Sequence, residues 1–223
     1  ELGADGINYH IFRYERGNQQ LDPEESYQLD ASVSWGNDVW EMEVEPYLNY
    51  FPNYIYLNPT AQYVEGLQLY NYRQAEVLRW GLEAQLTWNP TEHWQAYARG
   101  EYLYARQQSG EKKGFTLPFS TPWSIDTGVR YSFDCRGKGF VGLSAHIVGA
   151  QHEIVPPEKP TDGHWTLNLA AGKEMPLGGT TLKVTLHADN LLNRRYYDHT
   201  SYYRLIDVPE PGRNLSLMAG LEF

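Results

Sequence analysis

The sequence has a single cysteine among its 223 residues, so no internal disulfide can form, and Cys135 gives little information about the redox compartment. No apolar run reaches about 18 residues, which excludes a transmembrane helix but leaves barrel strands open. Lysine and arginine number 18, against 28 aspartate and glutamate residues. The net charge of −10 argues against nucleic acid as a partner, because nucleic-acid-binding proteins carry a basic footprint.

Motifs that carry chemistry are also few. The seven histidines include no His-Glu-x-x-His pair, and no cysteine and histidine cluster has zinc-finger spacing. Nothing resembles a nucleophile elbow or a hydrolase triad. We therefore predict no catalytic residues, no metal site, no cofactor and a protein that is not an enzyme.

Aromatic residues, by contrast, are abundant. They make up 14% of the chain, with 18 tyrosines and 7 tryptophans, although the mean hydropathy is −0.59. Many aromatic side chains within a polar average suit a barrel that has a wet lumen and a thin apolar exterior.

Apolar and polar residues alternate with period two along most of the chain. The final run is the clearest, with Leu215, Leu217, Ala219, Leu221 and Phe223 on one face and Ser216, Met218, Gly220 and Glu222 on the other. Successive side chains of a strand point to opposite sides, so this pattern predicts an antiparallel all-β protein. We predict about nine strands, at residues 24–36, 40–56, 74–88, 93–107, 122–134, 140–150, 164–174, 182–188 and 215–223. Residues 1–23, 57–73, 108–121 and 151–163 are predicted to be loops.

The connections alternate between short and long, as in outer-membrane barrels with tight periplasmic turns and long extracellular loops. Aromatic residues flank the short turns, as they do at membrane interfaces: Trp35, Trp40, Trp88, Trp94, Tyr131, Phe133 and Phe140. Phe223 ends at the same level. These residues predict a periplasmic aromatic girdle.

Charged residues occupy the opposite face of the strands. Glu41, Glu43 and Glu45 recur with period two, so their side of the sheet must face water rather than lipid. We expect the charges of this lumen face to pair across strands. Pro46 lacks a ladder donor and predicts a bulge or imperfect pairing at its position.

Both ends of the chain resemble TonB-dependent outer-membrane receptors. Near the C-terminus the matching residues are Asn190-Leu191-Leu192-Asn193, Tyr196-Tyr197, Pro211-Gly212-Arg213-Asn214 and the terminal Phe223. Near the N-terminus they are Glu1-Leu2 with Gly6, then Arg16-Gly17-Asn18, Leu21 and Pro23-Glu24-Glu25-Ser26. The ordered sets bracket residues 1–223.

The resemblance implies a transmembrane antiparallel β-barrel of roughly 22 strands with a plug domain in its lumen. Residues 1–223 are then the C-terminal part of that one barrel domain, about nine to ten strands, with the plug and the earlier strands preceding Glu1. The implied location is the outer membrane of a Gram-negative bacterium. The implied partners are outer-membrane lipid, the remaining barrel strands of the same protein, and TonB through the plug region.

The resemblance also implies uptake of a scarce ligand, most often a ferric siderophore, haem or cobalamin, as a small molecule or metal complex. Candidate ligand-binding residues lie in or beside the long loops: His10, Tyr54, Tyr63, His152, His199 and Tyr202. Aromatic loops recognise such ligands by stacking and hydroxyl hydrogen bonds. The alternative for each histidine is a solvated loop residue, and for each tyrosine a role in packing the loops together. Asn8 follows Gly6-Ile7 where importers of zinc or haem place a histidine, which weakens the case for metal import.

Two other readings of the sequence stay open. A passive porin-like channel would have the same strand pattern without a plug. A soluble all-β carbohydrate-binding module with aromatic platforms would bury its apolar faces instead of presenting them to lipid.

Overall fold

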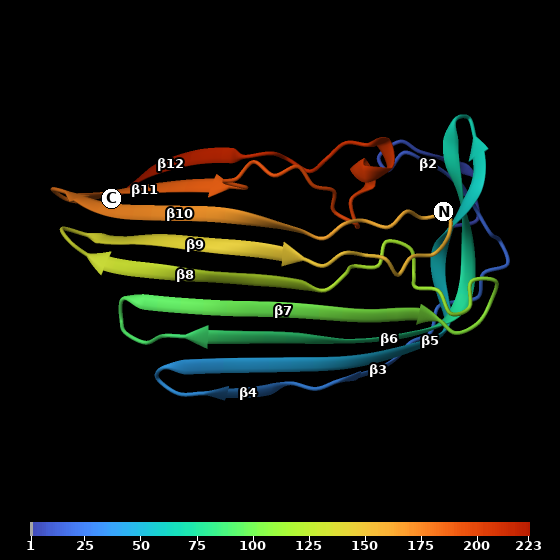
Figure 1. Ribbon diagram of the computed structural model, residues 1–223, viewed down its shortest axis with the longest axis horizontal. Helices are drawn as coiled ribbons and strands as arrows, with labels where there is room; N and C mark the ends of the chain where they lie inside the picture. The colour runs from blue at the N-terminus through green and yellow to red at the C-terminus, as the bar shows by residue number, and fades with distance from the viewer. Residues whose placement is uncertain (1) are drawn as a thin grey trace.

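The computed structural model describes residues 2–223, so Glu1 of the N-terminal motif lies outside the described residues. The chain forms one curved sheet of twelve strands. Figure 1 shows the strands lying side by side, with the tight turns at one end and the long loops at the other. The strands are β1 (Gly6–Asn8), β2 (Arg13–Arg16), β3 (Tyr27–Asp30), β4 (Val33–Gly36), β5 (Trp40–Val64), β6 (Leu67–Trp88), β7 (Trp94–Gln107), β8 (Ser124–Asp134), β9 (Lys138–Val148), β10 (His164–Leu177), β11 (Thr180–Asp189) and β12 (Asn214–Glu222). A short 3-10 helix, η1 (Tyr202–Ile206), lies in the last loop.

From β4 to β12 each strand pairs antiparallel with its neighbour along the chain. β3 and β4 both pair with β5 and act as one interrupted strand, so β3–β12 form a wall of nine strands, as the alternation predicts. The interruption lies opposite Pro46, whose carbonyl accepts a hydrogen bond from Ala31 N–H at 3.1 Å. The predicted irregularity at this proline is confirmed. No helix formed by the described residues is long and apolar enough to cross a membrane.

The register places the apolar side chains of the wall on one continuous face. Leu143, for example, pairs with Val129 on one side and Leu169 on the other. Leucines of this face stay exposed, with Leu82 at 40%, Leu143 at 41% and Leu217 at 70%. A soluble sandwich would bury these residues, so the predicted separation into a lipid face and an inner face is confirmed.

Rings gather at the tight-turn end of the outer face. Trp40 stacks on Trp88 across paired strands, with ring centroids 5.5 Å apart, and Trp94 lies 4.9 Å from Tyr131. Phe140 is a correction to the predicted girdle. It pairs with Ser132 and Gly172 on the inner face, and the Arg130 guanidinium lies 3.8 Å above its ring.

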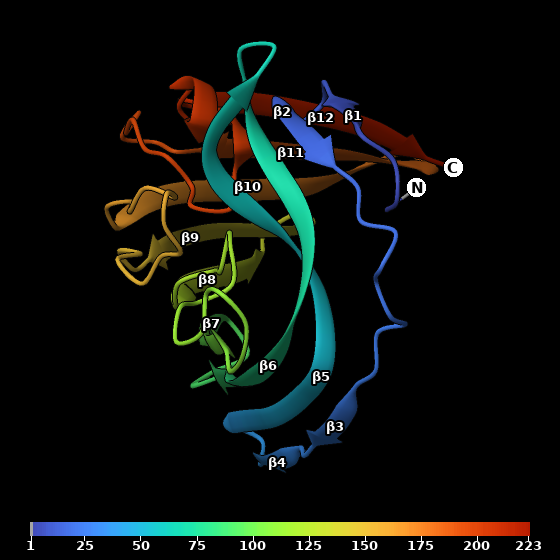
Figure 2. The ribbon, with the colours of Figure 1, turned by 90° about the vertical axis from the view of Figure 1, so that its right-hand side faces the viewer.

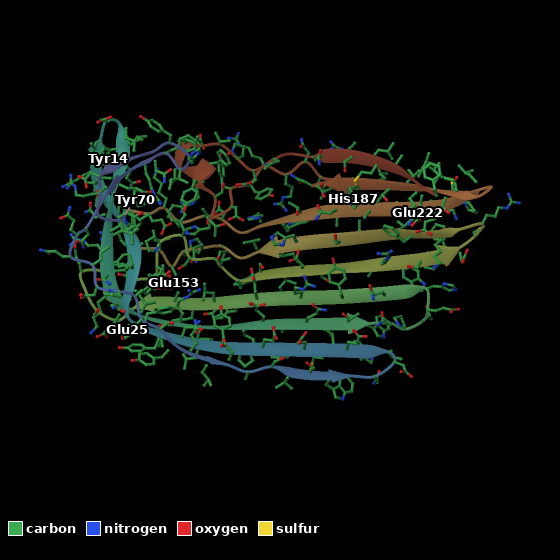
Figure 3. The ribbon with its side chains drawn as sticks, turned by 180° about the vertical axis from the view of Figure 1, so that it is seen from behind. Tyr14, Glu25, Tyr70, Glu153, His187 and Glu222 are labelled. Atoms are coloured by element: carbon green, nitrogen blue, oxygen red, sulfur yellow. The ribbon has the colours of Figure 1, made fainter. Side chains whose placement is uncertain are left out.

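The expectation that lumen charges pair across strands holds only in places. Lys183 on β11 pairs with Glu222 on the neighbouring strand β12 at 2.7 Å. Figure 3 shows Glu222 toward the tight-turn end. Glu83, however, lies directly between Glu45 and Glu101 in the register, so three like charges share one row. A face in contact with water tolerates such a row, because the high dielectric constant of water weakens the repulsion between like charges.

The predicted loop at 57–73 is wrong, because β5 and β6 continue through it as a long hairpin. Glu65 and Gly66 both have positive φ values, 53° and 80°, as the two-residue turn of a tight hairpin requires. We call residues 54–75 the arch. Figures 1 and 2 show it bending across the loop ends of β7–β10.

The first loop, predicted at residues 1–23, also contains strands. β1 and β2 form an antiparallel hairpin, and β2 then pairs in parallel with residues 68–71 of β6. The N-terminal hairpin is therefore held against the arch. A strand of three or four residues has too few alternating positions to stand out in the sequence.

The main cluster of buried apolar residues lies at the loop end of the inner face. The connection between β7 and β8 folds inward and packs Leu117 against the wall. Its neighbours are Phe51, Tyr56, Ala75, Val77 and Ala105, with Tyr54 and Leu103 packed beside them. The inner face is thus polar along the wall and apolar beneath the arch.

Candidate functional site

A cleft of about 390 Å³ lies beneath the arch at the loop end. Three sources contribute its walls: the inner face of the sheet, the arch, and the connection between β7 and β8. The lining residues are Arg13, Tyr54, Ile55, Tyr56, Leu57, Arg79, Leu103, Ala105, Leu117, Pro118, Phe119, Ser120, Thr121 and Tyr202. Four aromatic rings and two arginines are among them, and no carboxylate is.

Arg13 is held in the cleft wall by rings on both sides. Its guanidinium carbon lies 5.1 Å from the centre of the Tyr70 ring and 5.4 Å from that of Tyr202. Its Nε donates a hydrogen bond to Glu15 Oε1 at 2.8 Å. The side chain is 8% exposed, so Arg13 joins β2, the arch and η1 in one buried contact.

Electrostatics at this contact follow from burial. Burial raises the pKa of Tyr70 to about 12, so its hydroxyl stays protonated beside Arg13. Burial alone would raise the pKa of Glu15 too, but the hydrogen bonds that its carboxylate accepts and the charge of Arg13 hold the pKa below its ordinary value. Glu15 is therefore an anion that neutralises Arg13. Figure 3 shows Tyr70 at the loop end of the molecule.

Arg79 lines the cleft from β6 and has no carboxylate within ion-pair distance among residues 2–223. Its Nε is buried and has no hydrogen-bond partner in the described part of the chain. Asn49, its partner in the register, has an equally unpaired Oδ1. A bridging water can satisfy that pair, but the positive charge of Arg79 stays uncompensated.

A buried ionic cluster closes one side of the cleft. Arg204 of η1 donates through Nη2 to Glu158 Oε1 at 2.7 Å, and their side chains are 6% and 4% exposed. The backbone N–H of Phe119 donates to the same carboxylate oxygen at 3.1 Å. The Phe119 ring lies 4.9 Å from that of Tyr202. Glu158 thus fixes the position of two aromatic walls of the cleft.

His199 belongs to this cluster and not to the open surface. It is 2% exposed, its Nδ1 lies 2.9 Å from the Thr161 hydroxyl, and its Nε2 lies 3.4 Å from Glu158 Oε1. Its carbonyl accepts a hydrogen bond from Arg204 Nε at 2.7 Å. Its contacts therefore connect the loop before β10 to the loop before β12.

The structure brings together some of the residues that the sequence marks as candidates. Tyr54 and Tyr202 both line the cleft, and His199 lies in the cluster behind it. His10 lies between β1 and β2, Tyr63 near the tip of the arch, and His152 in the loop before β10, and all three are exposed. These three are not part of the cleft lining.

Several residues that form this site carry no distinguishing signal in the sequence. Phe119, Glu158 and Arg204 lie in loops without periodicity, so no pattern marks them. Arg13 falls in a segment predicted to be a loop. Arg79 lies in a strand with alternating apolar and polar residues, but the pattern does not distinguish it from the other lumen-facing charges. Only the folded contacts separate these residues from their neighbours.

The antiparallel wall has an apolar outer face, a polar inner face and a cleft at its loop end. This arrangement is that of part of an outer-membrane β-barrel. Residues 2–191 match the family described as TonB dependent receptor-like, beta-barrel. The chain belongs to the TonB-dependent receptor family, whose barrels lie in the outer membrane of Gram-negative bacteria.

Solved structures of receptors and transporters share the fold. The copper transporter OprC superposes with a TM-score of 0.77 at 18% identity, over 92% of this chain and 32% of that one. BauA, the ferric preacinetobactin receptor of Acinetobacter baumannii, gives 0.68 at 15% identity over 89% and 29%. The FrpB iron transporter of Neisseria meningitidis gives 0.68 at 13% over 93% and 32%. The chain therefore spans about a third of the length of these proteins.

Proposed function

We propose that this chain is the C-terminal part of one receptor barrel that takes up a scarce ligand in a TonB-dependent manner. A ferric siderophore, haem or cobalamin is the expected cargo, and the protein is not an enzyme. The observation that carries the proposal is the cleft beneath the arch, which combines rings with an unneutralised arginine at the loop end. The similar structures include a copper transporter, a ferric preacinetobactin receptor and an iron transporter, which supports a metal complex as the ligand.

Charge contrast supports an anionic ligand. The whole chain has a net charge of −10, yet the lining of the cleft contains two arginines and no carboxylate. Glu15 neutralises Arg13, which leaves Arg79 to attract a negative group. The rings of Tyr54, Phe119 and Tyr202 provide flat surfaces on which a conjugated or aromatic ligand can stack. The cleft therefore suits a flat, negatively charged complex.

The other predicted ligand residues take different parts in the proposal. His10, Tyr63 and His152 are exposed around the loop end and would meet the ligand before it enters the cleft. His199 would act through Glu158, by holding the loops that position Phe119. The plug and the TonB contact would come from the part of the protein that precedes this chain, together with the remaining barrel strands.

Growth of a deletion strain on single sources of ferric siderophores, haem, cobalamin or glycans would identify the ligand of the full-length receptor. With that ligand, we expect Tyr202→Ala and Arg79→Gln each to weaken binding by roughly tenfold, the equivalent of about 1.4 kcal/mol. Tyr9→Ala is the matched control, because Tyr9 is 74% exposed and outside the cleft. If all three variants bind the ligand as tightly as the unaltered receptor, the ligand binds outside the cleft.

The porin-like alternative predicts a different result. A passive channel would admit solutes without TonB and without saturable binding. Uptake that continues unchanged in a strain lacking TonB would therefore contradict the proposal. The continuous exposed apolar face does not fit the soluble carbohydrate-binding alternative.

A further inference from the structure

Two histidines lie close together on the inner face of the wall, away from the cleft. His146 is on β9 and His164 is at the start of β10, and these strands lie side by side in Figure 1. In the register His164 faces Val148 and His146 faces Thr166, so the two imidazoles are diagonal neighbours. Their ring centroids are 6.4 Å apart. When each nitrogen lies about 2.0–2.1 Å from one metal ion, two imidazole centroids are about 5 Å apart in tetrahedral geometry and about 6.4 Å apart on opposite sides of the ion. The observed separation is at the upper end of this range.

Asp126 orients the first of these rings. Asp126 on β8 lies directly opposite His146 in the register, and its Oδ1 is 2.9 Å from His146 Nδ1. A carboxylate in this position accepts the Nδ1 hydrogen and leaves the Nε2 lone pair free. The His146 side chain is 38% exposed, so Nε2 can be reached from the inner side. A carboxylate that holds the far nitrogen of a histidine is the usual arrangement behind a metal-binding imidazole.

The second ring has a nitrogen without a partner. His164 is 7% exposed, and its Nδ1 is buried without a hydrogen bond to any described residue. Tyr196 stacks on the ring at 4.2 Å with an angle of 21° between the planes, which fixes the orientation of the imidazole. Buried polar atoms in folded proteins almost always have a partner, so an unpaired imidazole nitrogen in a fixed ring requires an explanation.

We propose that His146 and His164 form a two-imidazole binding site for a divalent transition-metal ion, with Asp126 as the positioning residue. Imidazole nitrogen suits copper, nickel and zinc, and the affinity order for such ligands places Cu²⁺ first and Mn²⁺ last. No group of three or more histidine, cysteine, aspartate or glutamate residues between Leu2 and Phe223 could hold a metal. The bound ion therefore keeps water or the ligands of an arriving complex in its other positions.

This site does not depend on the ligand of the cleft. The residues that line the cleft come from other strands and loops, and none of them is in β9 or β10. A failure of the cleft proposal would leave this one intact, because its test measures metal binding and not uptake.

The test uses the purified full-length receptor in detergent, titrated with Cu²⁺, Ni²⁺, Zn²⁺ and Mn²⁺ alone. We expect saturable Cu²⁺ binding, weaker Ni²⁺ and Zn²⁺ binding and no Mn²⁺ binding. Electron paramagnetic resonance should show coupling of Cu²⁺ to two imidazole nitrogens. His146→Gln and His164→Gln should each lower Cu²⁺ affinity at least tenfold and remove one nitrogen from the spectrum. Asp126→Asn should weaken binding less and keep both nitrogens.

His187→Gln is the matched control, since His187 is an inner-face imidazole on β11 and lies opposite Ala170 and Ser216 in the register. It should bind Cu²⁺ like the unaltered protein. A loss equal to that of His146→Gln would overturn the proposal, as would Cu²⁺ binding that survives both site variants. A second test uses the unaltered protein. Mass spectrometry measures the rate at which diethyl pyrocarbonate modifies His146. Bound Cu²⁺ should slow it several-fold, and an unchanged rate would also overturn the proposal.

Discussion

The tight-turn half of the wall and its loop end are built in two different ways. In the tight-turn half each strand contacts its neighbours along the chain, and alternation separates apolar from polar side chains. At the loop end, Arg13 contacts Tyr70 and Tyr202, and Glu158 contacts Arg204, so residues far apart in sequence meet. The wall depends on a repeated pattern, and the loop end depends on single contacts.

The difference shows where function can change without loss of the fold. Lipid on one face and water on the other accept many side chains of the right polarity, so the wall tolerates substitution within each class. The loop end fixes Phe119 through one carboxylate, so one substitution there can alter the shape of the cleft. Binding residues on loops that a rigid scaffold positions are a common result of this arrangement.

The largest effect should come from breaking the buried ion pair at the loop end. Arg204→Met leaves Glu158 buried without its cation, and removal of one partner from such a pair typically costs about 3–5 kcal/mol. We expect faster amide hydrogen exchange in residues 150–163 and 198–208, while the strands of the wall keep their protection.

The double variant Arg204→Met with Glu158→Leu is the matched control. Replacement of both charges by apolar groups of similar size is often close to neutral, so much of the lost protection should return. If Arg204→Met alone leaves exchange in both loops unchanged, the ion pair does not hold the loop end together.

The next largest effect should come from a charge placed on the lipid face of the wall. Leu143→Arg places a charge on the lipid face between Val129 and Leu169, which costs about 2–4 kcal/mol near the middle of the membrane. We expect less folded receptor in the outer membrane. The amount is measured from the band of folded protein on gels of unheated samples. Ser144→Arg, one residue further on the inner face, should be much milder. Equal losses in the two variants would contradict the assignment of the faces.

A smaller effect concerns close packing on the inner face. A Cβ added at Gly81 would lie 2.6 Å from the backbone oxygen of Tyr102 and would overlap the Tyr47 ring. Gly81→Ala should therefore destabilise the barrel by about 1–3 kcal/mol, the usual cost of overpacking. At Gly220 on β12 an added Cβ meets nothing within 4 Å, so Gly220→Ala serves as control. Urea unfolding of the full-length protein in lipid vesicles should separate the two variants.

The same contrast explains what the sequence could predict. The nine wall strands and their faces follow from alternation, because lipid and water impose a simple rule on every residue. The arch was missed because Pro59 and the Glu65-Gly66 turn resemble loop punctuation, although Tyr63 and Leu67 favour a hairpin. The site could be predicted only through its loop tyrosines, which include Tyr54, Tyr56 and Tyr202. Its ionic residues take their roles from contacts between loops, which local sequence does not encode.

The smallest effect should appear on acidification of the N-terminal hairpin. Glu15 lies outside the membrane-spanning part of the strands and has a pKa held below its ordinary value in the folded state. A carboxylate of this kind stabilises the fold above its unfolded pKa, and the contribution disappears as the pH falls through the folded pKa. Below about pH 4 the contact of β2 with the arch should therefore loosen. Hydrogen exchange of residues 6–16, corrected for the intrinsic effect of pH, measures this. In Glu15→Gln, residues 6–16 should already exchange faster at pH 7, and acidification should add little further exchange. If acidification speeds exchange equally in both proteins, groups other than Glu15 are responsible.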